Sequence, residues 1–361
     1  MKFKLTSILV AGTLLLSCNS SDKSDLLVIP VDVYQNEPRP LSEISEDIKV
    51  IELETTDDCL IGGSGGGGAG RVLVSDDYIL FLDAILSDIK ILLFDSSGKF
   101  LRRIAKKGQG PGEYAVIYDV AADFLNNRIY ISTGKLMCYD FEGNFINEVK
   151  PFHLNYLNFT NNRLNAITSH IVSGDETDYK INAVLYEINN NLQVIDSMTF
   201  LSFNTNTKMS LVSNINNHIT YAGGNMYLCY PSPVFPMRNE NYIYRDTLYQ
   251  FKGKELIPQL ILKFNNEILT WSFRSLYLYR SSRYVFEQHT AEGLGWFYYD
   301  LKTKKGYNMK KGFIDDIHTG ENVHIYPFNA DADKFYYLYT NMNDSIDDEP
   351  NPTLYIGTLK K

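Results

Sequence analysis

Residues 89–104 read IKILLFDSSGKFLRRI, and residues 135–146 repeat the same plan as KLMCYDFEGNFI. In both copies an apolar run ends in an Asp, which is followed by a turn that contains a Gly and then by a Phe. These residues are Asp95, Gly98 and Phe100 in the first copy and Asp140, Gly143 and Phe145 in the second, 45 positions further on. Asp begins such a turn by bonding to nearby backbone, and Gly supplies the positive φ that a tight hairpin needs. The stretch predicts two strands joined by a hairpin, as part of a repeated unit.

Weaker copies of this unit follow along the chain. Residues 180–195 predict two strands around the turn Asn189–Asn191, and residues 295–307 form another clear copy. A period of 40 to 55 residues with several short strands in each unit is typical of a β-propeller. Six units can be counted after residue 70. The sequence therefore predicts an all-β fold, a six-bladed β-propeller over residues 27–361.

The last unit is short of strands, whereas two strand-like segments near the N-terminus, residues 27–33 and 48–55, belong to no unit. An N-terminal strand that completes the last blade would close the ring and remove an exposed sheet edge. We therefore expect such a strand in the last blade. Helix signals are scarce, and we expect one short inserted helix at residues 266–279.

The N-terminus carries a targeting pattern. Lys2 and Lys4 precede an apolar run that is too short to cross a bilayer, which needs ~20 apolar residues. Cys18 follows this run and is itself followed by a polar stretch, an order that resembles the bacterial lipobox. In such signals the chain is cleaved before the Cys, which is then acylated, with palmitate as one acyl group. We expect a lipoprotein signal peptide at 1–17, a flexible lipid-anchored tether at 18–26 and attachment to the membrane through Cys18.

The motifs together resemble a known family, the six-bladed propeller lipoproteins of gut-type Gram-negative bacteria, which are similar in shape to NHL-repeat propellers. The resemblance rests on Asp95–Ile104, Lys107–Tyr114 and Asn126–Ile131, and it is sharpest over residues 70–150. It implies the propeller fold but no particular activity. Together with the residues after Cys18, it implies an outer-membrane lipoprotein of the cell envelope, either periplasmic or surface-exposed.

Composition narrows the partners and the redox chemistry. The chain has 26 Tyr and 20 Phe, which suit half-buried strands, and its net charge is −9. A nucleic-acid partner requires clustered Lys and Arg, so we expect none. Besides Cys18, three widely spaced cysteines remain, at Cys59, Cys138 and Cys229. An odd, scattered set is a poor disulfide framework, and we expect Cys138 and Cys229 to be buried as small apolar residues.

Three local motifs favour structural interpretations. The glycine run at 62–70 contains a formal G-x-G-x-x-G, but a strand-like segment follows it where a phosphate loop needs a helix. The run is therefore interpreted as an inter-blade loop. Residues 108–114 favour a connection between blades over a ligand contact at the rim. The acidic residues at 344–349 lack the spacing of a calcium loop and favour a solvated loop.

Ligands of propellers bind where side chains from different blades converge, so local spacing reveals little about the site. As candidates in the central channel we choose four residues in or beside strands expected to be innermost: Arg71, Tyr118, Asp119 and His289. The six His do not form the close pairs of a zinc site, and no cofactor is evident. A divalent cation held in the channel by several blades stays an open alternative, and no catalytic residue is assigned.

The absence of a nucleophile motif and the rigid, anchored scaffold favour a binding or interaction module. Its ligand would be a glycan, a peptide or an envelope protein. The alternative is a metal-dependent lyase or hydrolase with its site in the central channel, so the question of enzymatic activity stays open. A purely structural role in the envelope is the third alternative.

Overall fold

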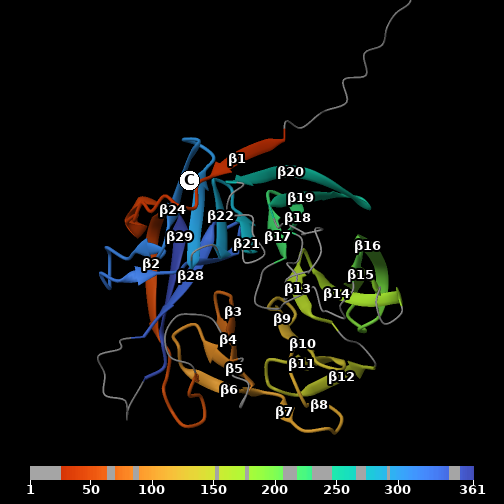
Figure 1. The fold of residues 1–361 in the computed structure, drawn as a ribbon. Helices are drawn as coiled ribbons and strands as arrows, with labels where there is room; N and C mark the ends of the chain where they lie inside the picture. The colour runs from red at the N-terminus through yellow and green to blue at the C-terminus, as the bar shows by residue number, and fades with distance from the viewer. Residues whose placement is uncertain are drawn as a thin grey trace, which may run out of the picture.

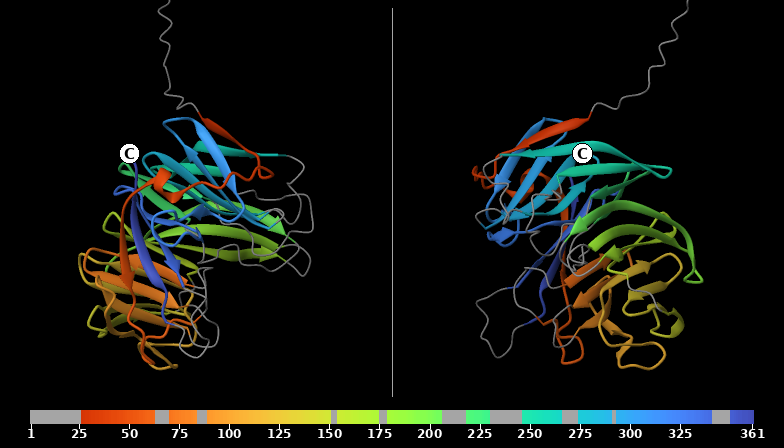
Figure 2. Two further views of the ribbon diagram at one scale, coloured as in Figure 1. Left: turned by 90° about the vertical axis from the view of Figure 1, so that its left-hand side faces the viewer. Right: turned by 45° about the vertical axis from the view of Figure 1, so that its right-hand side comes forward.

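The repeated strand–turn–strand unit folds into six sheets around a common axis, which confirms the six-bladed β-propeller (Figures 1 and 2). The structure is a computed structural model that describes residues 26–62, 70–83, 89–150, 154–174, 179–205, 218–229, 246–265, 274–290, 293–340 and 350–361. Each blade is an antiparallel meander whose first strand lies nearest the axis.

The first three blades are formed by consecutive strands. Blade 1 contains β3 (Gly70–Val74), β4 (Tyr78–Asp83), β5 (Lys90–Asp95) and β6 (Phe100–Ile104). Blade 2 contains β9 (Asp119–Asp123), β10 (Arg128–Ser132), β11 (Leu136–Asp140) and β12 (Phe145–Val149). Blade 3 contains β13 (Tyr156–Thr160) and three longer strands, β14 (Arg163–Gly174), β15 (Tyr179–Ile188) and β16 (Val194–Thr205).

The remaining blades include both N-terminal strands. Blade 4 contains β17 (Ile219–Ala222), β18 (Asn225–Cys229), β19 (Thr247–Lys252), β20 (Glu255–Phe264) and, outermost, β1 (Leu27–Val31). Blade 5 contains β21 (Arg274–Arg280), β22 (Tyr284–Thr290), β23 (Leu294–Asp300) and β24 (Lys305–Met309). Blade 6 contains β27 (Tyr326–Asn329), β28 (Lys334–Tyr339), β29 (Thr353–Leu359) and, outermost, β2 (Ser45–Glu52).

The continuous apolar runs of the sequence arise because a blade is buried on both faces. Successive side chains of a strand point to opposite faces. In β4, Ile79 and Phe81 join a core shared with blade 6, whereas Leu80 and Leu82 join a core shared with blade 2. All four are nearly inaccessible to solvent. Each such side chain contributes about 1.5–3 kcal/mol when buried, so packing between blades holds the ring together.

The N-terminal segment closes the ring at blade 6, as expected, and it also adds a strand to blade 4, which was not expected. β2 pairs antiparallel with β29 and supplies the fourth strand of blade 6, which confirms the predicted closure. β1 pairs parallel with β20 and extends blade 4 to five strands. The two strands are joined by residues 32–44, which include the 3-10 turn η1 (Leu41–Glu43). The N-terminal segment therefore connects blade 4 to blade 6 across blade 5.

The hairpin turn of blade 1 has the predicted chemistry and an additional contact. Asp95 Oδ1 accepts hydrogen bonds from the N–H groups of Ser97 and Lys99 at 2.9 and 3.1 Å. Gly98 has φ +92° and accepts a hydrogen bond at its carbonyl from the Glu54 N–H at 2.9 Å. A Cβ at Gly98 would lie 2.2 Å from the carbonyl oxygen of Glu52. The turn thus packs directly against the end of the closing strand β2.

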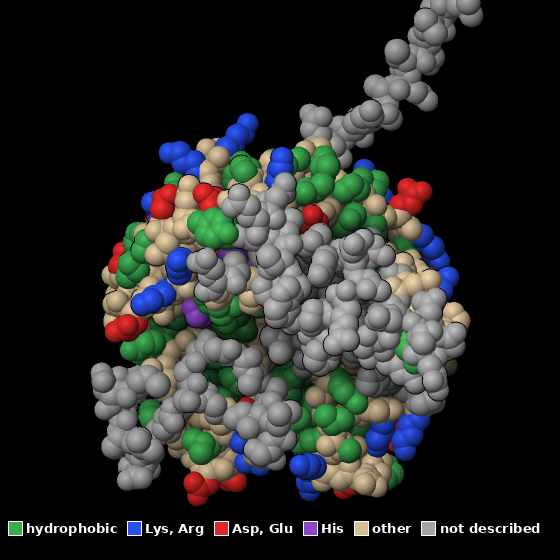
Figure 3. Space-filling view, in the orientation of Figure 1, with side chains coloured by type: hydrophobic (Ala, Val, Ile, Leu, Met, Phe, Trp, Pro, Cys, Tyr) green, Lys and Arg blue, Asp and Glu red, His purple; other side chains and the backbone are tan. Residues whose placement is uncertain are grey.

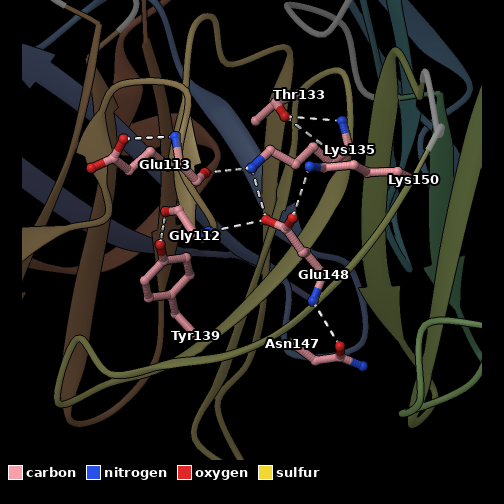
Figure 4. A network of polar contacts seen from close by, with 9 residues as sticks. Gly112, Glu113, Thr133, Lys135, Tyr139, Asn147, Glu148 and Lys150 are labelled. Carbon is pink, nitrogen blue, oxygen red and sulfur yellow. Dashed lines mark hydrogen bonds and ion pairs between the residues drawn. The ribbon is translucent and has the colours of Figure 1, made fainter.

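The segment between blades 1 and 2, residues 105–118, is a connection as expected, and a polar network fixes it to blade 2 (Figure 4). It includes the short parallel pair β7 (Lys106–Lys107) and β8 (Glu113–Tyr114). Lys135 Nζ donates to the Gly110 carbonyl at 2.9 Å and pairs with Glu148 at 2.7 Å. Burial alone would raise the pKa of Glu148, but Lys135, the Gly112 N–H and a second lysine lower it to about 2. The carboxylate therefore stays charged at neutral pH and holds the connection in place.

Other predictions have mixed outcomes. The helix expected at 266–279 is wrong from residue 274 onward, because Arg274–Arg280 forms β21 and packs its alternating aromatic residues as the inner strand of blade 5. Cys59, Cys138 and Cys229 are buried, as expected for Cys138 and Cys229, and burial raises the pKa of the Cys138 thiol to about 11. The signal peptide, Cys18, most of the tether and of the glycine run, the first part of the expected helix and the acidic cluster lie outside the described residues.

On the face shown in Figure 3, Lys and Arg side chains are interspersed with Asp and Glu around the rim. No helix among the described residues is both long and apolar enough to cross a membrane.

The remaining short pair, β25 (Phe313–Ile314) and β26 (Asn322–Val323), lies in the connection between blades 5 and 6.

Candidate binding site on the inner strands

Two of the predicted residues, Arg71 and Asp119, meet at the centre of the ring. Arg71 is the second residue of β3, and Asp119 is the first residue of β9. Arg71 Nη1 lies 2.5 Å from Asp119 Oδ2 and donates a second hydrogen bond to the carbonyl oxygen of Leu157 at 2.8 Å. The Leu157 N–H donates to Asp119 Oδ2 at 2.6 Å. This triangle of contacts joins blades 1, 2 and 3.

An aromatic residue extends the contacts to blade 4. The guanidinium carbon of Arg71 lies 5.1 Å from the ring centroid of Tyr156, a distance suited to a cation–π contact. On its other side the Tyr156 ring meets His218 edge-on, with centroids 4.9 Å apart. His218 directly precedes β17, and the Ile219 N–H donates to the Tyr156 hydroxyl at 3.5 Å. We call Arg71, Asp119, Tyr156, Leu157 and His218 the inner-strand cluster.

The members of this cluster are buried to different degrees. Asp119 is fully buried and its Oδ1 has no hydrogen-bond partner within the described part of the chain. Tyr156 is also fully buried, whereas the Arg71 side chain keeps 14% of its surface exposed. Arg71 is therefore the member that a ligand can reach.

Electrostatics keep the Arg71 guanidinium charged. Burial acts to lower the pKa of Arg71, but the Asp119 carboxylate together with Tyr156 and Tyr336 outweighs it, so that the pKa of Arg71 is raised. Burial raises the pKa of Asp119, and Arg71 together with the Leu157 N–H offsets part of this rise. Tyr336 of blade 6 also interacts electrostatically with Arg71. Burial raises the pKa of Tyr336, and the backbone of Val72 and the positive charge of Arg71 act to lower it.

Arg71 uses only part of its hydrogen-bonding capacity. Both of its hydrogen bonds leave from Nη1, and its Nε and Nη2 groups donate to none of the described residues. A guanidinium presents Nε and Nη2 as one planar edge that matches both oxygens of a carboxylate. The cluster thus holds a cation in a fixed orientation with a two-donor edge left over.

The other two predicted residues lie elsewhere. Tyr118 immediately precedes β9, is half-buried, and donates its backbone N–H to the Ser132 carbonyl at 2.8 Å. His289 lies on β22, the second strand of blade 5, where its Nδ1 is 2.7 Å from Glu287 Oε2. The His289 ring packs edge-on against Phe264 of blade 4. His289 therefore belongs to a buried pair between blades 4 and 5, apart from the inner-strand cluster.

Sequence reasoning missed four residues of these sites. Tyr156, Leu157 and His218 carry no local signal, because their contacts are made across blades. Glu287 could have been found, since a Glu and a His two residues apart in a strand share one face. Among the described residues, no group of three or more His, Cys, Asp and Glu side chains is placed to hold a metal ion.

The strand order and the inner-strand cluster define a six-bladed β-propeller with a charged, hydrogen-bonded centre. Within that class, residues 26–356 match the family described as "Domain of unknown function (DUF4934)", and the chain belongs to it. No protein of curated function matches the chain. The resemblance to NHL-repeat propellers and to lipoproteins continues to rest on the sequence motifs alone.

Solved structures support the fold. A protein of Bacteroides fragilis NCTC 9343 named "putative exported protein" aligns over 92% of this chain and 100% of its own, with a TM-score of 0.65 and 18% identity. At that identity the similarity shows the fold alone. A chain of a mitotic checkpoint complex aligns with a TM-score of 0.42 and 8% identity over 94% of this chain and 83% of its own. The WD40 domain of Toxoplasma gondii coronin aligns at 0.40 and 9% over 91% and 90%. The last two similarities are too weak to carry an argument.

Proposed function

We propose that this protein is an exported, lipid-anchored module of the cell envelope that binds a ligand at the centre of its propeller. The ligand is a glycan, a peptide or an envelope protein. The observation that carries the proposal is the Arg71 guanidinium. Contacts from blades 2 and 3 hold it in place, while no described residue accepts a hydrogen bond from its Nε and Nη2 edge. A rigid scaffold that presents an unused charged group at its centre suits recognition.

Export and anchoring have separate support. The name of the Bacteroides fragilis relative supports export. The apolar run that ends at Cys18 supports cleavage and acylation at that cysteine. The polar residues that follow Cys18 support the flexible tether at 18–26 between the lipid and the propeller.

Ligand binding is tested by thermal melting of the purified protein against a panel of acidic and neutral glycans, peptides and envelope extract. A ligand present at 100 times its Kd stabilises the folded state by about 2.7 kcal/mol, which gives a clear rise in melting temperature. We expect at least one member of the panel to produce such a rise. A saturating panel that leaves the melting temperature unchanged would contradict the proposed function.

Anchoring is tested by replacing Cys18 in the full chain expressed in a Gram-negative host. Cys18→Ala removes the acylation site, so we expect loss of metabolic labelling with a palmitate analogue and release of the protein from the membrane fraction. Cys59→Ala is the matched control, because Cys59 is buried and its thiol hydrogen-bonds to the Glu54 carbonyl. Labelling that survives Cys18→Ala would show that this cysteine is not the anchor.

A further inference from the structure

We infer that the ligand carries a carboxylate, and that both of its oxygens bind the Nε and Nη2 edge of Arg71. This inference rests on the proposed function and specifies the chemistry of the same site. Its basis is a comparison between Arg71 and the other half-buried arginines of the chain that pair with carboxylates.

In Arg283 a carboxylate of the same chain binds the Nε and Nη2 edge of the guanidinium. Its Nε lies 3.0 Å from Asp300 Oδ1 and its Nη2 lies 2.6 Å from Asp300 Oδ2, so one carboxylate occupies the whole edge. Arg39 binds both oxygens of Glu43 through the same two nitrogens. Both side chains are partly exposed, at 20% and 28% of their surface. In these two arginines an internal carboxylate fills the Nε and Nη2 edge, whereas the more exposed Arg102 and Arg163 pair with a carboxylate through Nη1.

Arg71 is paired differently. Asp119 takes Nη1 alone and shares it with the Leu157 carbonyl, so the nearest internal carboxylate is held away from the Nε and Nη2 edge. The Leu157 N–H keeps Asp119 Oδ2 in this position. The guanidinium carbon also lies over the Tyr156 ring, 5.1 Å from its centroid. A ligand carboxylate would take at Arg71 the place that Asp300 takes at Arg283.

The geometry also explains why a carboxylate fits better than a neutral group. Charge-assisted bidentate bonds are about twice as strong as bonds between neutral groups, and they fix orientation. A neutral ester or amide offers a single strong acceptor and leaves one donor of the edge unmatched. The carboxylate could belong to a uronic acid of a glycan or to the C-terminus of a peptide, and the two sources share this chemistry.

The test is a calorimetric titration of the wild-type protein with matched acid and neutral probes. Galacturonate oligomers and their methyl esters represent the glycan source, and triglycine and its amide represent the peptide source. We expect one acid series to bind about tenfold or more tightly than its neutral partner, because hydrogen bonds to charged groups contribute about 1.5–3 kcal/mol. The series that binds identifies the source.

Variants then locate the binding group. Arg71→Lys keeps a cation beside Asp119 but removes the planar edge, so we expect at least a tenfold loss of affinity for the acid probe. Arg283→Lys is the matched control, because Asp300 already fills its edge, and it should leave affinity unchanged. Melting curves show whether each variant is folded, and the comparison of acid with neutral probes requires no variant.

Different failures are distinguishable. Equal binding of acid and neutral probes, or full affinity in Arg71→Lys, overturns the carboxylate inference and leaves the binding function intact. Absence of binding by all four probes also overturns the inference, and the wider panel of neutral glycans, peptides and envelope extract then decides the function. If nothing in that panel stabilises the protein, the proposed function fails as well.

Discussion

Asp119→Ala is expected to lower the free energy of unfolding by about 3–5 kcal/mol, the usual range when one partner of a buried ion pair is removed. The carboxylate is fully buried and accepts hydrogen bonds from Arg71 Nη1 and from the Leu157 N–H. Its loss leaves the Arg71 guanidinium without its counter-charge and the Leu157 N–H without its acceptor. Because these groups belong to blades 1 and 3, the change loosens three blades at once.

Chemical denaturation measures this effect, and two variants give it a reference. Asp119→Asn keeps an oxygen that can accept from the Leu157 N–H, so it should destabilise less than Asp119→Ala. Asp196→Ala breaks the ion pair between Asp196 and Lys254, whose side chains are 52% and 70% exposed, respectively. This variant should change the free energy of unfolding little, because solvent already screens the pair. Equal losses of unfolding free energy in Asp119→Ala and Asp196→Ala would contradict the prediction that the inner-strand cluster stabilises the fold.

Gly98→Ala is the second large effect. Any residue with a Cβ is strained at φ +92°, at a cost of about 1–2 kcal/mol. The new Cβ would also meet the Glu52 carbonyl oxygen at 2.2 Å and the Ile51 side chain at 2.9 Å. Overpacking of this kind adds about 1–3 kcal/mol, so the total should reach about 2–5 kcal/mol.

Gly143→Ala separates the two contributions. Gly143 occupies the same turn position in blade 2 with φ +81°, but the nearest atom to its Cβ is 3.5 Å away. It should therefore cost only the backbone strain. Because the clash at Gly98 falls on the end of β2, Gly98→Ala should also increase proteolytic cleavage within residues 45–55. Equal costs for the two substitutions, with no new cleavage, would show that the turn does not support the closing strand.

The fold was predictable because its determinants are local and repeated. The Asp and Gly of the hairpin turns in blades 1 and 2 recur at an offset of 45 residues, and burial on both faces makes the inner strands of a blade apolar runs. Pairing of β1 with β20 was not predictable, since a parallel contact between distant segments leaves no local pattern. The helix expected at 266–279 is wrong from residue 274 onward for a related reason. Its apolar spacing is ambiguous over a short window, and the inner strand of blade 5 requires residues 274–280.

The candidate site was predictable in part. Arg71 and Asp119 could be chosen because each lies at the start of a strand that follows a connection between units, about one repeat apart. That they bind each other, with Leu157 as the third member, depends on how the inner strands converge. The unused edge of Arg71 depends on which nitrogen Asp119 takes, and that is decided entirely by tertiary geometry.

The pairing of β2 with β29 also sets the order in which the ring assembles. Val50 lies opposite Tyr355, so a strand near the N-terminus joins a blade whose other strands are synthesised after those of the other five blades. Contacts between such distant segments form slowly, because a long loop must be ordered before they can contribute. The backbone of residues 45–52 therefore stays unpaired until β29 has been synthesised. We expect unfolding of the closed ring to begin with dissociation of β2 from β29. The unfolding rate of the protein would then depend on the rate at which β2 dissociates.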